Sequence, residues 1–215
     1  MPTSRSYRDS CGMARALDVV GERWALLVIR ELTLIPQRFS ELRHALPNAS
    51  SNLLADRLRE LEHHGVIRRR KLAPTAGPQV YELTEWGRKL EPIVLGLSEW
   101  GIDAPHPPEP TSLSATSVLN FLRIGAHPDP AAPPIVCRLD LDGSVWTVSV
   151  DSGKVEVRTG EPTTADISLR TDPKTLGSLL ANPASLDSAL TEGTVALVGD
   201  LQALNHLLSL YGATA

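Results

Sequence analysis

Four prolines fall within a short stretch near the middle of the chain, and they constrain the fold more than any other feature. Residues 103–114 read DAPHPPEPTSLS. Each proline lacks a backbone N–H donor and disfavours helical geometry at the residue before it, so no helix or central strand is expected to cross this stretch. We therefore predict two domains, at 1–103 and 114–215, joined by a proline-rich linker at 104–113. A chain of 215 residues is long enough for each domain to bury its own core.

Charge is distributed unevenly between the two halves. Residues 1–104 carry 15 Lys and Arg against 13 Asp and Glu, a net charge of +2, whereas residues 105–215 carry 6 against 12, a net charge of −6. A polyanion is attracted by positive potential, so only the first half is a plausible partner for a nucleic acid.

The remaining composition indicates a cytoplasmic protein without a metal or other cofactor. Cys11 and Cys137 lie far apart and have no neighbouring Cys or His at metal-ligand spacing, so neither a disulfide framework nor a metal site is expected. The first twelve residues, MPTSRSYRDSCG, are too polar for a signal peptide. No apolar run is long enough to cross a bilayer, so no membrane partner is expected.

The first half is predicted to be mainly helical. Met13, Leu17 and Val20 recur at helical spacing, and residues 24–34 are almost wholly apolar, which is typical of a buried helix. A short helix is expected over 39–46, capped by Ser40, and a second one begins after a cap at Ser50 or Ser51 and ends at Gly65. The second helix has two faces, one formed by Leu54, Leu58 and Leu61 and the opposite one by Asn52, Asp56, Arg59 and His63. Two such helices joined by a turn indicate a helix-turn-helix.

A basic β-hairpin is predicted directly after this motif. Residues 66–72 and 80–83 are β-prone and flank the turn sequence APTAGPQ, and a further helix is expected from Thr84 to about Trp100. A helix-turn-helix followed by a hairpin is a winged helix, whose second helix enters the major groove of double-stranded DNA. The basic cluster of the hairpin would contact phosphates and comprises Arg68, Arg69, Arg70 and Lys71. The side chains expected to read bases are Ser51, Asn52, Ala55, Asp56 and Arg59.

A plainer interpretation of the basic cluster is a solvated strand edge. Because a strand alternates its faces, only about half of these side chains can point toward one partner. Their place beside a helix-turn-helix favours DNA.

Three ordered motifs in the first half resemble a known family. They are CGMARALDVVGERWALLVIREL, QRFSELRHALPNASSNLLADRLRELEHHGVIRRR and YELTEWGRKLEPIV. Together they are similar to the HxlR-type winged-helix transcriptional regulators of bacteria. The resemblance implies a homodimer on a palindromic operator, with the N-terminal helix and the helix from Thr84 at the dimer interface. It also implies phosphate contacts by Arg38 and Ser40, base reading by residues 50–59 including Ser50, and Arg69 as the wing arginine.

The second half is predicted to be an α+β domain with an antiparallel sheet and flanking helices. Residues 135–141 and 145–150 form a hairpin, because Asp142-Gly143 suits a tight turn with positive φ angles. Further strands are expected at 155–158, 167–170 and 195–198, and helices at 117–124, 173–180, 184–190 and 201–210. The last helix should place four leucines on one face, namely Leu201, Leu204, Leu207 and Leu208.

Two sequences in this half, ADISLRTDPKTLGSLL and GTVALVGDLQALNHLLSLY, resemble the sterol-carrier-protein (type two) fold. That resemblance implies an apolar cavity for lipid-like ligands, and hence a small hydrophobic effector that shifts the population of DNA-competent dimers. The residues of such an effector pocket are unknown from sequence. The alternative is that the leucines fill a core and the domain only helps the chain to dimerise.

Two further alternatives are redox sensing by Cys11 and a role other than gene regulation. Cys11 precedes the first helix, where the helix N-terminus and Arg8 or Arg15 would stabilise a thiolate, so redox sensing competes with a buried apolar role. No nucleophile elbow, phosphate-binding loop or zinc-protease helix occurs, and we expect no enzymatic activity and no catalytic residues. The competing class is a lipid carrier or protein-interaction module whose winged helix binds protein.

Overall fold

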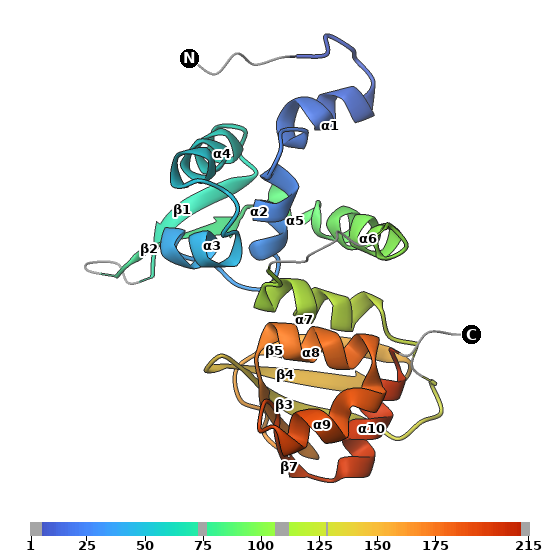
Figure 1. The fold of residues 1–215 in the computed structure, drawn as a ribbon. Coiled ribbons are helices and arrows are strands. Elements are labelled where there is room, and N and C mark those ends of the chain that lie inside the picture. Colours follow the sequence, from blue (N-terminus) through green and yellow to red (C-terminus); the bar gives the residue numbers. More distant parts are fainter. Residues whose placement is uncertain (1–5, 73–76, 106–111, 128, 212–215) are drawn as a thin grey trace. The chain divides into compact units, whose positions relative to one another are not determined.

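The computed structural model describes residues 6–72, 77–105, 112–127 and 129–211 (Figure 1). The chain divides into two compact units, Met1–Leu97 and Ser98–Ala215, which we describe separately. Part of the predicted wing turn (73–76) and most of the predicted linker (106–111) lie outside the described residues. The domain limits at 103 and 114 therefore stay a prediction.

The first unit is a helix-turn-helix with a β-hairpin, as predicted. Its elements, with α6 running on past Leu97, are α1 (Gly12–Val20), α2 (Ala25–Glu31), α3 (Phe39–Ala45), α4 (Ser51–His63), β1 (Ile67–Lys71), β2 (Gln79–Leu83), α5 (Glu85–Arg88) and α6 (Glu91–Ile102). Its core is contributed by α2, α3, α4 and both strands, with Ile29, Leu42, Leu54, Leu58 and Leu83 almost fully buried. The helical and extended periods of the sequence therefore correspond to real elements.

Several details of the predicted helices were wrong. The helix expected over 24–34 begins only at Ala25, because Trp24 has φ 78°, and it ends at Glu31. Arg38, not Ser40, caps α3, because the Glu41 carboxylate reaches back to accept the Arg38 backbone N–H at 2.6 Å. Along α1 the buried positions are Ala14 and Val20.

The helix predicted from Thr84 to Trp100 is two helices. Thr84 caps α5, and its hydroxyl oxygen accepts the Gly87 backbone N–H at 3.0 Å. The break at 89–90 precedes Pro92, which has no N–H to donate to the preceding turn. The tighter i→i−3 bonds from Lys89 to Trp86 and from Leu90 to Gly87 close the first helix.

The second unit has a five-stranded sheet with helices packed on one face (Figure 1). Its elements are α7 (Ala115–Ile124), β3 (Ile135–Leu141), β4 (Ser144–Asp151), β5 (Lys154–Thr159), β6 (Ile167–Thr171), α8 (Pro173–Ala181), the 3-10 helix η1 (Pro183–Ser185), α9 (Leu186–Thr191), β7 (Ala196–Gly199) and α10 (Leu201–Ser209). The predicted Asp142-Gly143 hairpin is confirmed, with φ of 52° and 82° at these residues. Of the four leucines expected on one face of α10, Leu201 is exposed.

The α+β fold class is confirmed, but the sheet is mixed: three of its four strand pairs are antiparallel as predicted, and one pair is parallel. Its order is β5-β4-β3-β6-β7, and β6 runs parallel to β3. The segment after β5 crosses the face of the sheet opposite the apolar cavity, where the Gly160 carbonyl accepts a hydrogen bond from the Thr147 hydroxyl and Glu161 pairs with Arg138 at 2.7 Å. The chain therefore enters β6 beside β3 in the same direction. The alternation of apolar and polar residues along a strand shows which face of the sheet is buried. It does not show how the chain connects one strand to the next.

Candidate nucleic-acid interface

Helix α4 presents a polar face opposite its buried leucines. Ser50 caps the helix, and its Oγ accepts the Leu53 backbone N–H at 3.3 Å. Leu54, Leu58 and Leu61 are almost fully buried, which fixes the rotation of the helix about its axis. The predicted base-reading residues lie on or beside the opposite face: Ser51, Asn52 and Arg59 are exposed, while Ala55 and Asp56 are half-buried. Arg59 pairs with Asp56 along this face.

The turn between α3 and α4 is held by Arg43, a residue that the sequence analysis missed. The Arg43 Nε donates to Ser51 Oγ at 2.8 Å, and Nη1 donates to the carbonyl oxygens of Pro47 and Ala49 at 3.2 and 3.1 Å. One side chain thereby joins the end of α3, the turn and the first residue of α4. The only sequence signal was a basic residue in the last turn of a helix, which is too common to single it out.

The start of α3 is joined to the wing by backbone hydrogen bonds. Gln37 donates to the Tyr81 carbonyl at 3.0 Å, and Tyr81 donates to the Gln37 carbonyl at 2.8 Å, forming a short antiparallel bridge. Arg38 and Ser40, the predicted phosphate contacts, follow directly and are both exposed. The position of these two residues relative to the wing is therefore set by main-chain geometry.

The wing arginines alternate between two sets of partners. Arg68 and Arg70 both donate to Glu82 on the neighbouring strand, with their Nε atoms 2.7 and 2.6 Å from its carboxylate oxygens. Arg69 turns the other way and meets Glu62 of α4, with Nε and Nη2 at 2.8 and 2.6 Å from the two oxygens. This pairing raises the pKa of Arg69 further above its ordinary value, chiefly through the hydrogen bond to Glu62. The predicted alternation is thus confirmed.

Within the described part of the chain, the Lys71 side chain has no hydrogen bond or ion pair, although its backbone pairs with Gln79 in the hairpin. Of the four residues in the basic cluster, Lys71 best fits the plainer interpretation that these side chains are simply solvated. The other three carry acidic partners that hold their guanidinium groups in fixed positions.

Glu82 should make the stability of the wing depend on pH. Burial by itself raises the pKa of Glu82, but hydrogen bonds from Arg70 and Arg68 outweigh it and hold that pKa below its ordinary value of 4.5. Because the folded carboxyl has the lower pKa, its contribution is present above pH 4.5 and is lost as pH falls through the folded value.

We expect Glu82→Gln to remove this part of the acid dependence. Amide hydrogen exchange in β1 and β2, followed between pH 7 and pH 3, measures it. Glu85→Gln, an exposed change nearby, is the control. Identical acid profiles for wild type and Glu82→Gln would contradict the role of the ion pairs.

Cys11 lies at the exposed N-terminus of α1 rather than in a core. Its sulfur accepts the Ala14 backbone N–H at 3.3 Å and so caps the helix. The interpretation of Cys11 as a buried apolar residue was therefore wrong. Neither Arg8 nor Arg15, as the structure describes them, forms a hydrogen bond with the Cys11 sulfur.

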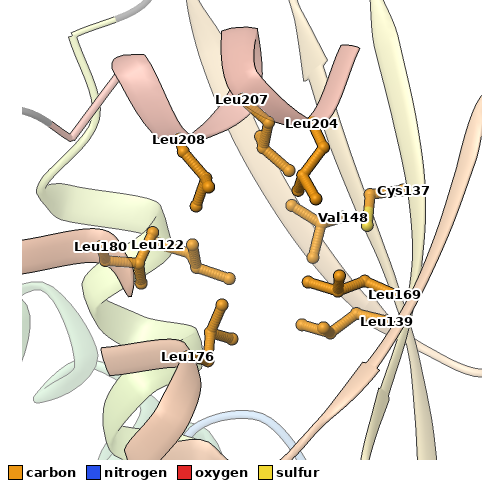
Figure 2. A pocket seen from close by; sticks show the side chains of 10 residues that line it. All are labelled: Leu122, Cys137, Leu139, Val148, Leu169, Leu176, Leu180, Leu204, Leu207 and Leu208. Atoms are coloured by element: carbon orange, nitrogen blue, oxygen red, sulfur yellow. The ribbon is translucent and has the colours of Figure 1, made fainter. Parts of the chain in front are cut away.

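The second unit contains a small apolar cavity between its helical layer and its sheet. Figure 2 shows the leucines of α7, α8 and α10 facing the sheet, with the Cys137 sulfur among the sheet residues. The cavity measures about 10 Å³. Ligand sites for small molecules are far larger, on the order of 300–1,000 Å³. Burial raises the pKa of the Cys137 thiol to about 12.

Comparisons with known proteins match both units. The HxlR-like helix-turn-helix family matches residues 19–107. The HTH-type transcriptional regulator YvaP of Bacillus subtilis, itself uncharacterized, is 39% identical over 89 residues, which are 41% of this chain and 82% of YvaP. The chain belongs to the HxlR-like helix-turn-helix family.

A second relative, the HTH-type transcriptional regulator YodB of Bacillus subtilis, is 35% identical over 88 residues, or 41% of this chain and 79% of YodB. Among solved structures, the redox regulator HypR in its oxidized form is 35% identical, with a TM-score of 0.42 over 45% of this chain and 100% of HypR. Residues 135–211 match the SCP-2 sterol transfer family. This HxlR-family chain therefore carries a second domain beyond its winged helix, as the sequence indicated.

No described helix of this HxlR-family chain is both long and apolar enough to span a membrane. The residues that the structure describes also include no group of three or more His, Cys, Asp or Glu side chains arranged to hold a metal ion.

Proposed function

We propose that this protein is a sequence-specific transcriptional regulator that binds double-stranded DNA. The observation that carries this proposal is the polar face of α4, which lies opposite its buried leucines and beside a wing whose arginines are held in place by acidic partners. α4 enters the major groove and reads bases through Ser50, Ser51, Asn52, Ala55, Asp56 and Arg59. Arg38, Ser40, Arg68, Arg69, Arg70 and Lys71 contact phosphates.

The test is a titration of the full-length protein against DNA from upstream of its own gene and against a scrambled duplex, at several salt concentrations. Specific regulators prefer their site by roughly a thousandfold or more, and counterion release gives a steep salt dependence. Equal, weak and salt-insensitive binding to both duplexes would contradict the proposal and would favour a protein partner for the winged helix.

We propose further that the protein is a homodimer that reads a palindromic operator. Three large apolar side chains, Ile93, Leu97 and Trp100, follow helical spacing along one face of α6 and are 60%, 48% and 74% exposed. Met13 and Leu17, four residues apart on α1, are also exposed. Exposed apolar faces of this kind mark protein interfaces. Sedimentation should give twice the chain mass, and Ile93→Glu with Trp100→Glu should give the monomer.

For the second domain we propose a small hydrophobic effector. The match to a sterol transfer family and the wholly apolar cavity lining support this proposal. Because the cavity has room for about one water molecule, binding must separate α10 or α8 from the sheet. A fluorescent fatty acid titrated into the protein tests this, with faster amide exchange in α10 expected on binding. If the probe does not bind and exchange does not change, the leucines form only a core.

Redox sensing through Cys11 is a second candidate function, supported by the exposure of its sulfur at a helix N-terminus. Cys137 is buried, and a thiol with a pKa near 12 is almost entirely protonated at neutral pH. We therefore expect a disulfide reagent such as dithiobis(nitrobenzoate) to titrate one thiol per folded chain and two after unfolding. Cys11→Ser should abolish the folded-state reaction. Two rapidly reacting thiols in the folded protein would contradict this assignment.

A further inference from the structure

Arg43 differs from the arginines around it in its partners. Arg38, Arg57, Arg59 and the three wing arginines are each paired with a carboxylate. As the structure describes it, Arg43 contacts only neutral oxygens, two from the turn and one from Ser51. Its positive charge is therefore not compensated by an acidic side chain where α4 begins.

The hydrogen bond to Ser51 limits what that side chain can do. A serine hydroxyl has one proton to donate and two lone pairs to accept with. The Arg43 Nε, 2.8 Å away, uses one lone pair. The Ser51 proton donates to no acceptor in the part of the chain that the structure describes, and Ser51 is exposed at the first position of α4. The proton is therefore available to donate to a partner outside the protein.

The positive charge of Arg43 also favours Ser51 as a hydrogen-bond donor. A cationic donor on the oxygen polarises the O–H bond and makes the hydroxyl a better donor. A second donor, such as the amino group of cytosine or adenine, would bring another positive hydrogen beside the guanidinium. An acceptor on the DNA is favoured instead.

We propose that Arg43 is a positioning residue that makes Ser51 a hydrogen-bond donor to an acceptor atom of the DNA. Major-groove acceptors are purine N7, guanine O6 and thymine O4, and a phosphate oxygen shares the same chemistry. This inference rests on the DNA-binding function proposed above. Arg43 does not itself touch the DNA. It fixes the turn through Pro47 and Ala49 and sets the direction of the Ser51 hydroxyl.

The test is selection of binding sequences from a random double-stranded DNA library by the full-length protein and its variants. Ser51→Ala removes the donor, and Ser51→Thr retains it. Arg43→Lys keeps the charge but cannot form the three-bond fork. Arg88→Lys, an exposed change on α5, controls for the substitution itself. Circular dichroism confirms that each variant is folded.

If Ser51 contacts a base, Ser51→Ala and Arg43→Lys should each lower the preference at the same position of each half-site, by roughly five- to tenfold. Ser51→Thr and Arg88→Lys should keep it. At that position the Arg43→Lys/Ser51→Ala double variant should lose no more preference than Ser51→Ala alone, because Arg43 acts on this contact through Ser51. If Ser51 contacts a phosphate, the same loss appears equally on selected and scrambled DNA.

Three outcomes overturn the inference. Ser51→Ala could retain wild-type affinity and preference. The losses of preference at that position caused by Arg43→Lys and by Ser51→Ala could multiply in the double variant, which would show that Arg43 acts there independently of Ser51. If the wild type itself enriches no sequence, the DNA-binding proposal fails and this inference fails with it.

Discussion

Gly87→Ala should destabilise the winged helix by about 3 kcal/mol, because the added methyl group has no space. A Cβ built on Gly87 would lie 2.0 Å from the carbonyl oxygen of Val66 and 3.0 Å from its carbonyl carbon. Both are backbone atoms of the residue before β1, so no side-chain rotation relieves the clash. The same carbonyl accepts the Thr84 N–H at 3.0 Å. Moving it would disturb the junction between the wing and α5.

Chemical denaturation at a fixed protein concentration, followed by tryptophan fluorescence, measures this loss. Gly12→Ala is the matched control, because nothing lies within 4 Å of a Cβ at that position. It should change the free energy of unfolding by less than about 0.5 kcal/mol. Equal stabilities for the two variants would show that α5 does not pack closely against Val66.

Arg69→Glu should weaken DNA binding by roughly a hundredfold at moderate salt if Arg69 contacts a phosphate. In the proposed dimer the variant removes that contact from each wing and leaves a new carboxylate beside Glu62, which lies 2.6 Å from Arg69. Two lost phosphate contacts should make the log–log salt slope shallower by about two. Binding to duplex DNA at several salt concentrations gives both quantities.

The double variant Arg69→Glu/Glu62→Arg distinguishes two causes of a lost affinity: a missing cation on the wing and a disordered wing. It restores the pairing of strand and helix and the net charge, but it places the cation on α4. If the single variant loses affinity because the wing is disordered, the double variant should recover it. If the phosphate contact needs a cation on the wing, the double variant should stay weak. If Arg69→Glu keeps the wild-type affinity and salt slope, Arg69 does not contact the DNA.

Much of the winged helix could be predicted from sequence because its signals are local. The spacing of Leu54, Leu58 and Leu61 defines the buried face of α4, and burial of that face fixes which residues are exposed. Ser50 and Gly65 delimit the helix through a side-chain cap and a φ of 73°. The wing could be predicted because the residue pattern changes from helical to extended and is interrupted by a turn rich in Pro and Gly. These features need no knowledge of distant residues.

The partners of Arg43 and of the wing arginines could not be predicted, because they come from other elements. Arg43 reaches across the turn to Ser51, Arg69 reaches back to Glu62, and Glu82 lies on the strand opposite Arg68. Such pairs depend on register and on the packing angle between elements, which periodicity does not specify.

The sequence by itself determined the type of each main element, the polar and apolar faces of α4, the Asp142-Gly143 hairpin and the family. Only the tertiary structure decided that β6 runs parallel to β3, that Cys11 is exposed, and that the apolar cavity is about 10 Å³. The physical reason is the distance along the sequence between the residues that interact. Helix caps, turns and hydrophobic periods are set within a few residues, whereas strand direction, burial and cavity volume result from how distant segments pack together.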